Sequence, residues 1–230
     1  MISLILPYWD RQQATLRALD CLATHYAGLD LEVIVVDDGS PAPFRAPSLP
    51  LNLRVIRMPD KDAPRNPCVP FNVGVAAAEG DYIAISNAEI LHRAPVLQQL
   101  LDEAMRGGPM TYATAACWDA EKCRWHAHST RQPLLADRTE ILMPAGSQYH
   151  FLGVMSRALW DLAGGFDEEF RDGAGYDDND LLMQLGRAGA RFVLRDDLVV
   201  EHPRVGARAA WTAPMYARNR ELFVQKWSRR

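Results

Sequence analysis

The chain has 230 residues with 48% hydrophobic content, enough for one large core or for two halves that share a sheet. A formal net charge of −4, with no Lys/Arg block in the body of the chain, argues against nucleic acid as a partner. No apolar run reaches the ~20 residues of a membrane-spanning helix, and the start lacks the basic region of a signal peptide. We therefore expect a cytoplasmic domain with four reduced cysteines.

The first half of the chain alternates apolar strands with helices. Helices are predicted over 12–26, from apolar residues at helical spacing, and over 69–78. Short apolar, often β-branched runs predict strands over residues 2–6, 31–36, 53–56 and 82–85. This alternation predicts an α/β fold with a mixed, mostly parallel central sheet flanked by helices.

Polar residues follow the second and fourth of these strands. Asp37 and Asp38 end the second, and Asn87 and Glu89 follow the fourth. Ligands bind outside the carboxyl ends of strands in such sheets, so we expect these side chains to border one crevice. The sequence has no glycine-rich dinucleotide motif and no Walker A loop. A divalent metal would then neutralise any bound phosphates, and Glu89 with His202, after a late strand, would suit Mn²⁺ or, less well, Mg²⁺.

The second half is less regular. Strands are predicted over 111–117, 151–156, 191–195 and 198–201, and helices up to 162, over 178–188 and over 216–227. The last helix is amphipathic with a basic end. It could make a peripheral contact with the inner membrane face, but such a helix more often packs on its own domain.

An acidic run, Asp177, Asp178, Asn179 and Asp180, stands directly before the apolar residues of the helix at 178–188. These acceptors exceed what helix capping requires. Acids at the rim of a core are where folds place a catalytic base or contacts to a charged ligand. The alternative is an over-charged helix start.

A second constellation comprises Cys117, Cys123, His126 and His128. These residue types suit Zn²⁺, although their spacing is not that of a standard zinc knuckle. The alternative that we favour is an acceptor-side loop with incidental thiols, because free cysteine usually behaves as a small buried hydrophobe.

Taken in order, these motifs resemble a family 2-type glycosyltransferase with the nucleotide-diphospho-sugar transferase (GT-A) fold. The middle and end are most similar to the β-1,4-galactosyltransferase and polypeptide N-acetylgalactosaminyltransferase branches. The resemblance implies one domain over 1–230, with a nucleotide-binding half at 1–90 and an acceptor-binding and catalytic half at 91–230. The matching segments are residues 3–8, 35–40, 71–74, 80–83, 86–89, 164–170, 175–180 and 201–202.

The resemblance also implies roles for single residues. Asp178 matches the catalytic base, Glu89 the second acid of the Asp-x-Asp motif, and His202 a later metal-binding histidine. Asn87 replaces the first acid of that motif and carries no charge to offset a cation. Acceptor binding falls to Tyr176, Asp177 and Asp180. Nucleotide-sugar binding falls to Pro7, Tyr8, Asp10, Asp38, Arg65, Asn72 and Asn87.

The expected function is an inverting, metal-assisted transfer of a sugar from a nucleotide donor, most simply a UDP-sugar. The acceptor would be a glycan or a lipid-linked glycan in bacterial surface polysaccharide assembly. The replacement at Asn87 keeps a second hypothesis open: a non-catalytic GT-A module that binds a sugar nucleotide or a partner transferase.

Overall fold

The computed structural model describes residues 1–63, 66–130, 151–204 and 211–228. Within these ranges the helices are α1 Gln12–Tyr26, α2 Cys68–Ala77, α3 Val96–Gly107, α4 Arg157–Ala163, α5 Asp177–Arg187 and α6 Ala213–Trp227, with a 3₁₀ turn η1 at Glu168–Asp172. The strands are β1 Ile2–Tyr8, β2 Leu31–Asp37, β3 Asn52–Arg57, β4 Tyr82–Ser86, β5 Leu91–His92, β6 Thr111–Asp119, β7 Arg124–Ala127, β8 Leu152–Ser156 and β9 Arg191–His202.

The described strands form one sheet in the order β3-β2-β1-β4-β8-β6-β9-β5, and β7 pairs with β6. The pairs β1–β2, β2–β3, β1–β4 and β6–β9 are parallel. The pairs β4–β8, β6–β8, β6–β7 and β5–β9 are antiparallel. Strands β1, β2, β3, β4, β6 and β9 therefore run in one direction and β5, β7 and β8 in the other. The expected mixed, mostly parallel sheet is confirmed.

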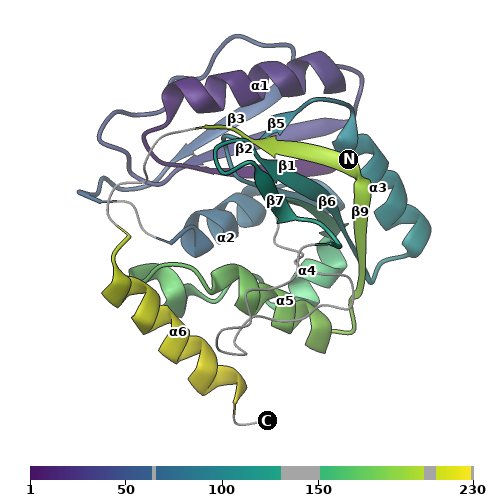
Figure 1. The fold of residues 1–230 in the computed structure, drawn as a ribbon. Coiled ribbons are helices and arrows are strands. Elements are labelled where there is room, and N and C mark those ends of the chain that lie inside the picture. Colours follow the sequence, from purple (N-terminus) through teal and green to yellow (C-terminus); the bar gives the residue numbers. More distant parts are fainter. Residues whose placement is uncertain (64–65, 131–150, 205–210, 229–230) are drawn as a thin grey trace.

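The sheet separates two apolar cores, because successive side chains of a strand point to opposite faces. Leu4 and Leu6 of β1 pack with Leu19 of α1 on one face. Ile5 between them packs with Phe71 of α2 on the other. Figure 1 shows α1 on one side of the sheet and α2, α5 and α6 on the opposite side. This layering leaves the ends of the strands as the place where polar side chains gather.

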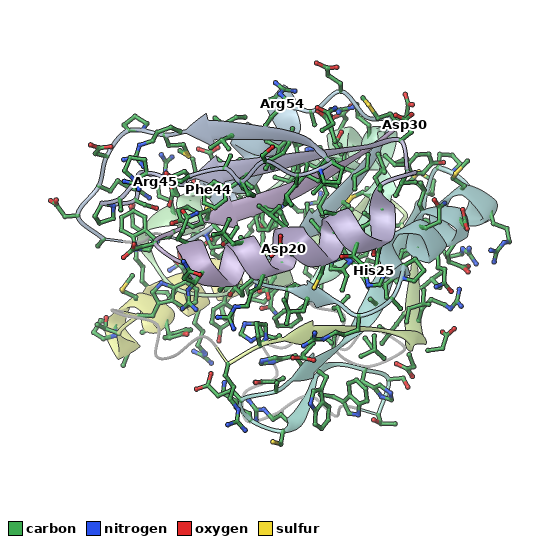
Figure 2. The ribbon with its side chains drawn as sticks, turned by 90° about the horizontal axis from the view of Figure 1, so that it is seen from above. Asp20, His25, Asp30, Phe44, Arg45 and Arg54 are labelled. Atoms are coloured by element: carbon green, nitrogen blue, oxygen red, sulfur yellow. The ribbon has the colours of Figure 1, made fainter. Side chains whose placement is uncertain are left out.

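The loop after β2 is fastened to the start of α1. The Gln12 side chain donates to the Arg45 carbonyl at 2.8 Å and accepts from the Arg45 N–H at 3.0 Å. Phe44 packs against Tyr8 with ring centroids 4.8 Å apart. Figure 2 shows Phe44 and Arg45 together at one end of α1, with His25 towards the other end of the helix. These contacts hold the loop beside the carboxyl ends of β1 and β2.

Two features of the second half differ from expectation. The strands predicted over 191–195 and 198–201 are one strand, β9: Arg195 pairs with Ala115 and Val199 with Ala116, so the three residues between them form a bulge. Polar Asp196 and Asp197 in this bulge made one strand look like two. Helix α3 was missed, although its buried residues recur at helical spacing: Val96, Leu97, Leu100, Leu101 and Ala104.

The structure also bears on the membrane question. Among the helices in the described ranges, we find none with the length and apolar content needed to cross a bilayer.

Candidate functional site

Strand register brings polar residues from distant parts of the chain to one edge of the sheet. In β6 and β9 Asp119 pairs with His202. In β5 and β9 Leu91 pairs with Glu201, which brings the segment before β5 alongside the end of β9. Glu89 lies in that segment. Polar side chains from the ends of β6 and β9 and from the segment after β4 thus lie close together, whereas the expected common crevice of Asp37, Asp38, Asn87 and Glu89 stays a prediction.

The two residues predicted as metal ligands are in contact. Glu89 is only 4% exposed, and its Oε1 lies 3.5 Å from His202 Nε2. His202 Nδ1 is buried without a hydrogen-bond partner among the described residues. A buried carboxylate oxygen that faces an imidazole nitrogen is a donor set that fits a divalent cation such as Mn²⁺. The residues present therefore fit the metal that the resemblance implies.

A further pair, which sequence reasoning did not assign to this site, lies beside them. Asp119 Oδ2 is 2.7 Å from His126 Nε2. His126 stacks on Phe151 at 4.7 Å and meets His202 edge-on at 5.5 Å between ring centroids. One ligand atom each from Asp119, His126 and His202 lie within 4.8 Å of one another. Burial raises the pKa of Asp119, but the hydrogen bond from the Lys122 backbone and the charge of His126 outweigh it and lower that pKa.

The four-residue zinc hypothesis does not match this arrangement. Cys117 is buried in β6, whereas Cys123 is exposed in the β6–β7 turn. His128 Nδ1 is 2.8 Å from Thr130 Oγ1. Of the four, only His126 belongs to the metal-capable group found among the described residues. The missing signal was the strand register, because Asp119 and His202 are far apart in sequence.

The residues predicted to bind the nucleotide border the ends of β1 and β2. The Asp38 N–H donates to the Tyr8 carbonyl at 3.0 Å, and Asp38 forms an ion pair with Lys61. Asp10 is exposed, with a φ of 45°, and its N–H donates to Ser40 Oγ at 3.1 Å. Pro7 and Asn87 are half-buried at the ends of β1 and β4, and burial raises the pKa of Tyr8. Their nucleotide-binding roles stay predictions, and Arg65 lies outside the described residues.

The Asn72 side chain is hydrogen-bonded within the protein. Its Nδ2 donates to the Phe166 carbonyl at 2.8 Å and to Glu168 Oε1 at 3.1 Å, and its Oδ1 accepts from the Phe166 N–H at 3.0 Å. An amide whose donor and acceptor are both engaged by protein has little left for a ligand. Asn72 therefore fastens α2 to the turn before η1, and its role in binding the nucleotide sugar stays a prediction.

Asp37 holds the loop that carries Asp38. Its carboxylate is buried and accepts hydrogen bonds from the Ser40 and Phe44 N–H groups, each at 2.9 Å, and from Arg57 at 2.6 Å. Burial alone raises the pKa of Asp37, but these bonds outweigh burial and lower it below its ordinary value. Asp37 is thus a structural acid beside the predicted nucleotide contacts.

We expect Asp37→Asn to lower the free energy of unfolding by about 1–3 kcal/mol at neutral pH, because an amide cannot accept all three bonds. The pKa of Asp37 is lowered from 3.8, so the unfolded state takes up the proton first as pH falls. Wild-type protein should lose this contribution in acid, and its advantage over the variant should narrow below about pH 4. Urea denaturation at several pH values measures both effects.

The matched control is Asp60→Asn, since exposed Asp60 is the other carboxylate bound by Arg57, at 2.5 Å. Its expected effect is below about 0.5 kcal/mol, as for other surface substitutions. Equal losses in the two variants, or an advantage that persists in acid, would contradict the role given to Asp37.

The start of α5 is fixed by a tight turn. Gly175 and Tyr176 have φ values of 64° and 66°. Asn219 of α6 donates to the Gly175 carbonyl at 2.9 Å, and Tyr176 packs against Phe223 of α6 at 5.7 Å between ring centroids. Left-handed backbone is uncommon outside glycine, so these contacts hold Tyr176 in a conformation that starts the helix at the next residue, Asp177.

The acids of this first helical turn point in different directions, because each residue of a helix is rotated by about 100° from the last. Asp177 is buried and accepts from Asn66 Nδ2 at 2.8 Å. Asp180 is completely buried. Asp178 alone is half-exposed, and its charge, after burial, contributes to raising the pKa of Tyr112 in β6. Of the three, Asp178 is the one that a substrate could reach.

Asp180 is hydrogen-bonded to residues of α6. Its Oδ1 accepts from Trp227 Nε1 at 2.7 Å, and its Oδ2 accepts from Lys226 at 2.9 Å and from Gln184 at 2.7 Å. Burial raises the pKa of Asp180, although these partners oppose the rise. Asp180 and Asp177 are both buried and bonded within the protein, and the acceptor-binding roles implied for them stay predictions. The same contacts show that α6 packs on its own domain.

Comparisons with known proteins agree with this geometry. The family model described as glycosyl transferase family 2 matches residues 3–157. No curated protein that was compared matches the chain. The structure is similar to that of S. aureus TarS 1–349 in complex with UDP-GlcNAc, with a TM-score of 0.69 and 17% identity over 98% of this chain and 66% of that one. It is also similar to the mannosyltransferase PcManGT from Pyrobaculum calidifontis in complex with GDP-Man and Mn²⁺, with a TM-score of 0.63 and 17% identity over 100% of this chain and 64% of that one.

At these identities the likeness shows the fold, which is the expected GT-A fold. The chain spans less than two thirds of the length of either neighbour. Neither comparison distinguishes the galactosyltransferase and N-acetylgalactosaminyltransferase branches, so the resemblance to those branches stays a prediction.

Proposed function

The chain belongs to glycosyl transferase family 2, and on this basis we propose that it transfers a sugar from a nucleotide donor to a glycan or lipid-linked acceptor, with inversion at the anomeric carbon. The observation that carries the proposal is the contact between buried Glu89 and His202 at the carboxyl edge of the sheet, 3.5 Å apart. This pair joins the end of β9 to the segment after β4, where ligands of α/β sheets bind.

The donor side of the proposed site needs groups that hold a diphosphate and its base. Pro7, Tyr8, Asp10 and Asp38 stand at the ends of β1 and β2 and are proposed to border the nucleoside. A divalent cation bound by Glu89 and His202 would supply positive charge to the departing diphosphate. The proposal assigns no charge to Asn87, which can only offer an amide oxygen or donate a hydrogen bond.

The acceptor side needs a base. A hydroxyl is a poor nucleophile at neutral pH, so a carboxylate within hydrogen-bond reach takes its proton as the new glycosidic bond forms. We assign this step to Asp178, the one half-exposed acid of the three at the start of α5. Asp177 and Asp180 hold that start in place through Asn66 and α6. Attack opposite to the leaving diphosphate would convert an α-linked donor into a β-linked product.

A thermal-shift panel tests the donor class. The panel would contain UDP, GDP, UDP-GlcNAc and GDP-Man, with and without Mn²⁺. We expect UDP and a UDP-sugar to raise the melting temperature with Mn²⁺, because a ligand that binds only the folded state stabilises it. Asp38→Asn should reduce the shift if Asp38 contacts uracil or ribose. Asp62→Asn, an exposed acid near Lys61 in sequence, serves as the control.

Each outcome of the panel decides between hypotheses. A shift with GDP alone would mean that the donor nucleotide is GDP and not UDP. A shift that does not depend on metal would support the sugar-nucleotide site but contradict the role of the metal. A shift from none of the compounds would favour the second hypothesis, a non-catalytic module that binds a partner transferase.

The acceptor in the proposal is a bacterial surface polysaccharide precursor at the cytoplasmic side of the membrane. Two cations of the basic C-terminal helix are paired with acids of the same domain, as expected for the alternative that the sequence favours. Lys226 donates to Asp167 at 2.6 Å and to Asp180 at 2.9 Å, and Arg218 lies 3.6 Å from Asp172. Because these cations form ion pairs within the domain, the proposal gives α6 no role as a membrane anchor.

A further inference from the structure

We propose that Asp119 and His126 bind the same divalent cation as His202 and Glu89, which makes a centre of two imidazoles and two carboxylates. The inference deepens the proposed function, because it shares His202 and Glu89 with the metal pair proposed above. It assigns metal binding to two residues that the family motifs do not include.

Three strands and the segment after β4 carry the four side chains. Asp119 ends β6, His126 lies in β7, and His202 ends β9, while Glu89 follows β4. One potential ligand atom each from Asp119, His126 and His202 lie within 4.8 Å of one another. Ligands at about 2.1 Å from a common ion are separated by roughly 3–4 Å, so small side-chain rotations suffice to close the set.

Charge gives a second reason. The family's motif has two acids after the fourth strand, and here Asn87 replaces the first. A site with Glu89 alone would bring one negative charge to a dication. Buried Asp119 brings a second carboxylate from a different strand, at a position that β6–β9 pairing sets opposite His202. The replacement at Asn87 is thereby offset in space without an acid nearby in sequence.

The two carboxylate oxygens of Asp119 have different partners. Its Oδ1 accepts from the Glu121 and Lys122 N–H groups, each at 3.0 Å, and so fixes the β6–β7 turn. Its Oδ2 faces His126 at 2.7 Å. A purely structural acid would explain the first set of bonds. It would not explain why His126 meets the other oxygen while a ligand atom of His202 lies within 4.8 Å of both residues.

The donor set predicts which metals bind. Imidazole nitrogen favours Zn²⁺ and other transition ions over Mg²⁺, which prefers oxygen. We therefore expect the protein without nucleotide to bind Zn²⁺ more tightly than Mn²⁺, and Mn²⁺ more tightly than Mg²⁺. Removing His126 should narrow this preference, whereas removing the charge of Asp119 should weaken all three ions.

Isothermal titration of the metal-free chain with Zn²⁺, Mn²⁺ and Mg²⁺, without nucleotide, tests the inference. The variants are His126→Ala and Asp119→Asn. The amide of the second keeps an oxygen for the turn, so the hairpin should survive. The control is His128→Ala, which removes a histidine two residues away in the sequence that lies outside the cluster. Circular dichroism before titration verifies that each variant is folded.

Binding of Mn²⁺ and Zn²⁺ that weakens by about 10-fold or more in both test variants, but not in the control, would support the centre. Unchanged affinity in His126→Ala and Asp119→Asn would overturn it, and so would wild-type protein that binds no ion without nucleotide. The proposed function fails separately: it fails if no nucleotide shifts the melting temperature, whatever the titrations show.

Discussion

Asp178→Asn is expected to lower kcat by about 10²–10⁴-fold, the usual contribution of a general base. An amide matches the carboxylate in size but has no basicity with which to take the acceptor proton. Donor affinity should stay unchanged, because the proposal places Asp178 on the acceptor side of the transferred sugar. Release of UDP from the donor that the panel identifies measures the rate, and the nucleotide-induced melting shift measures donor binding.

Asp172→Asn is the matched control for this experiment. Asp172 is an exposed acid at the end of η1, whose carboxylate lies 3.6 Å from Arg218. The rate should be the same as that of wild type. If Asp178→Asn turns over normally, another group is the base. If it loses donor binding in step with the rate, Asp178 acts on the donor side, and the division of the site proposed above is wrong.

Glu89→Gln is expected to lower kcat/KM by about 10²–10³-fold, comparable to the loss of one group that stabilises charge in a transition state. Gln keeps the size of the side chain and one oxygen but removes the negative charge beside His202, 3.5 Å away. The remaining activity should respond little to added Mn²⁺. Titrating Mn²⁺ in the UDP-release assay for wild type and variant gives both quantities.

Glu201→Gln controls for the loss of a charge on the same strand end. Glu201 is next to His202, but its carboxylate pairs with Arg93, with Arg93 Nη2 and Nε at 3.1 and 3.2 Å from its two oxygens. It should retain wild-type rate and Mn²⁺ response. A Glu89→Gln enzyme with full rate and unaltered Mn²⁺ dependence would remove Glu89 from the metal site.

Much of the fold could be read from local patterns. The apolar runs that became β1, β2 and β4 and the helical spacing of α1 predicted elements within a residue or two of those observed. These elements lie in the first part of the chain, and their apolar periodicity alone is enough to predict them. The break in β9 was misread because a bulge of polar residues looks like a loop until the partner strand is known.

The roles of the acids at the start of α5 could not be predicted from the sequence pattern. The sequence identified Asp177, Asp178 and Asp180 as more acids than a helix cap needs, and all three lie in the first turn of α5. It could not assign a separate role to each acid, because their partners are Asn66 before α2 and Lys226 and Trp227 of α6. These partners are distant in sequence, and the helical rotation alone does not say which neighbour each acid meets.

The sequence by itself determined the family and the α/β architecture, and it identified Glu89, His202 and Asp178 as the residues to examine. Only the tertiary structure showed that Asn72 and Asp180 are engaged within the protein and that Asp119 and His126 stand beside His202. The physical reason is that secondary structure follows from local propensity and periodicity, whereas a site depends on strand order and register. Those are set by long-range packing that no single segment encodes.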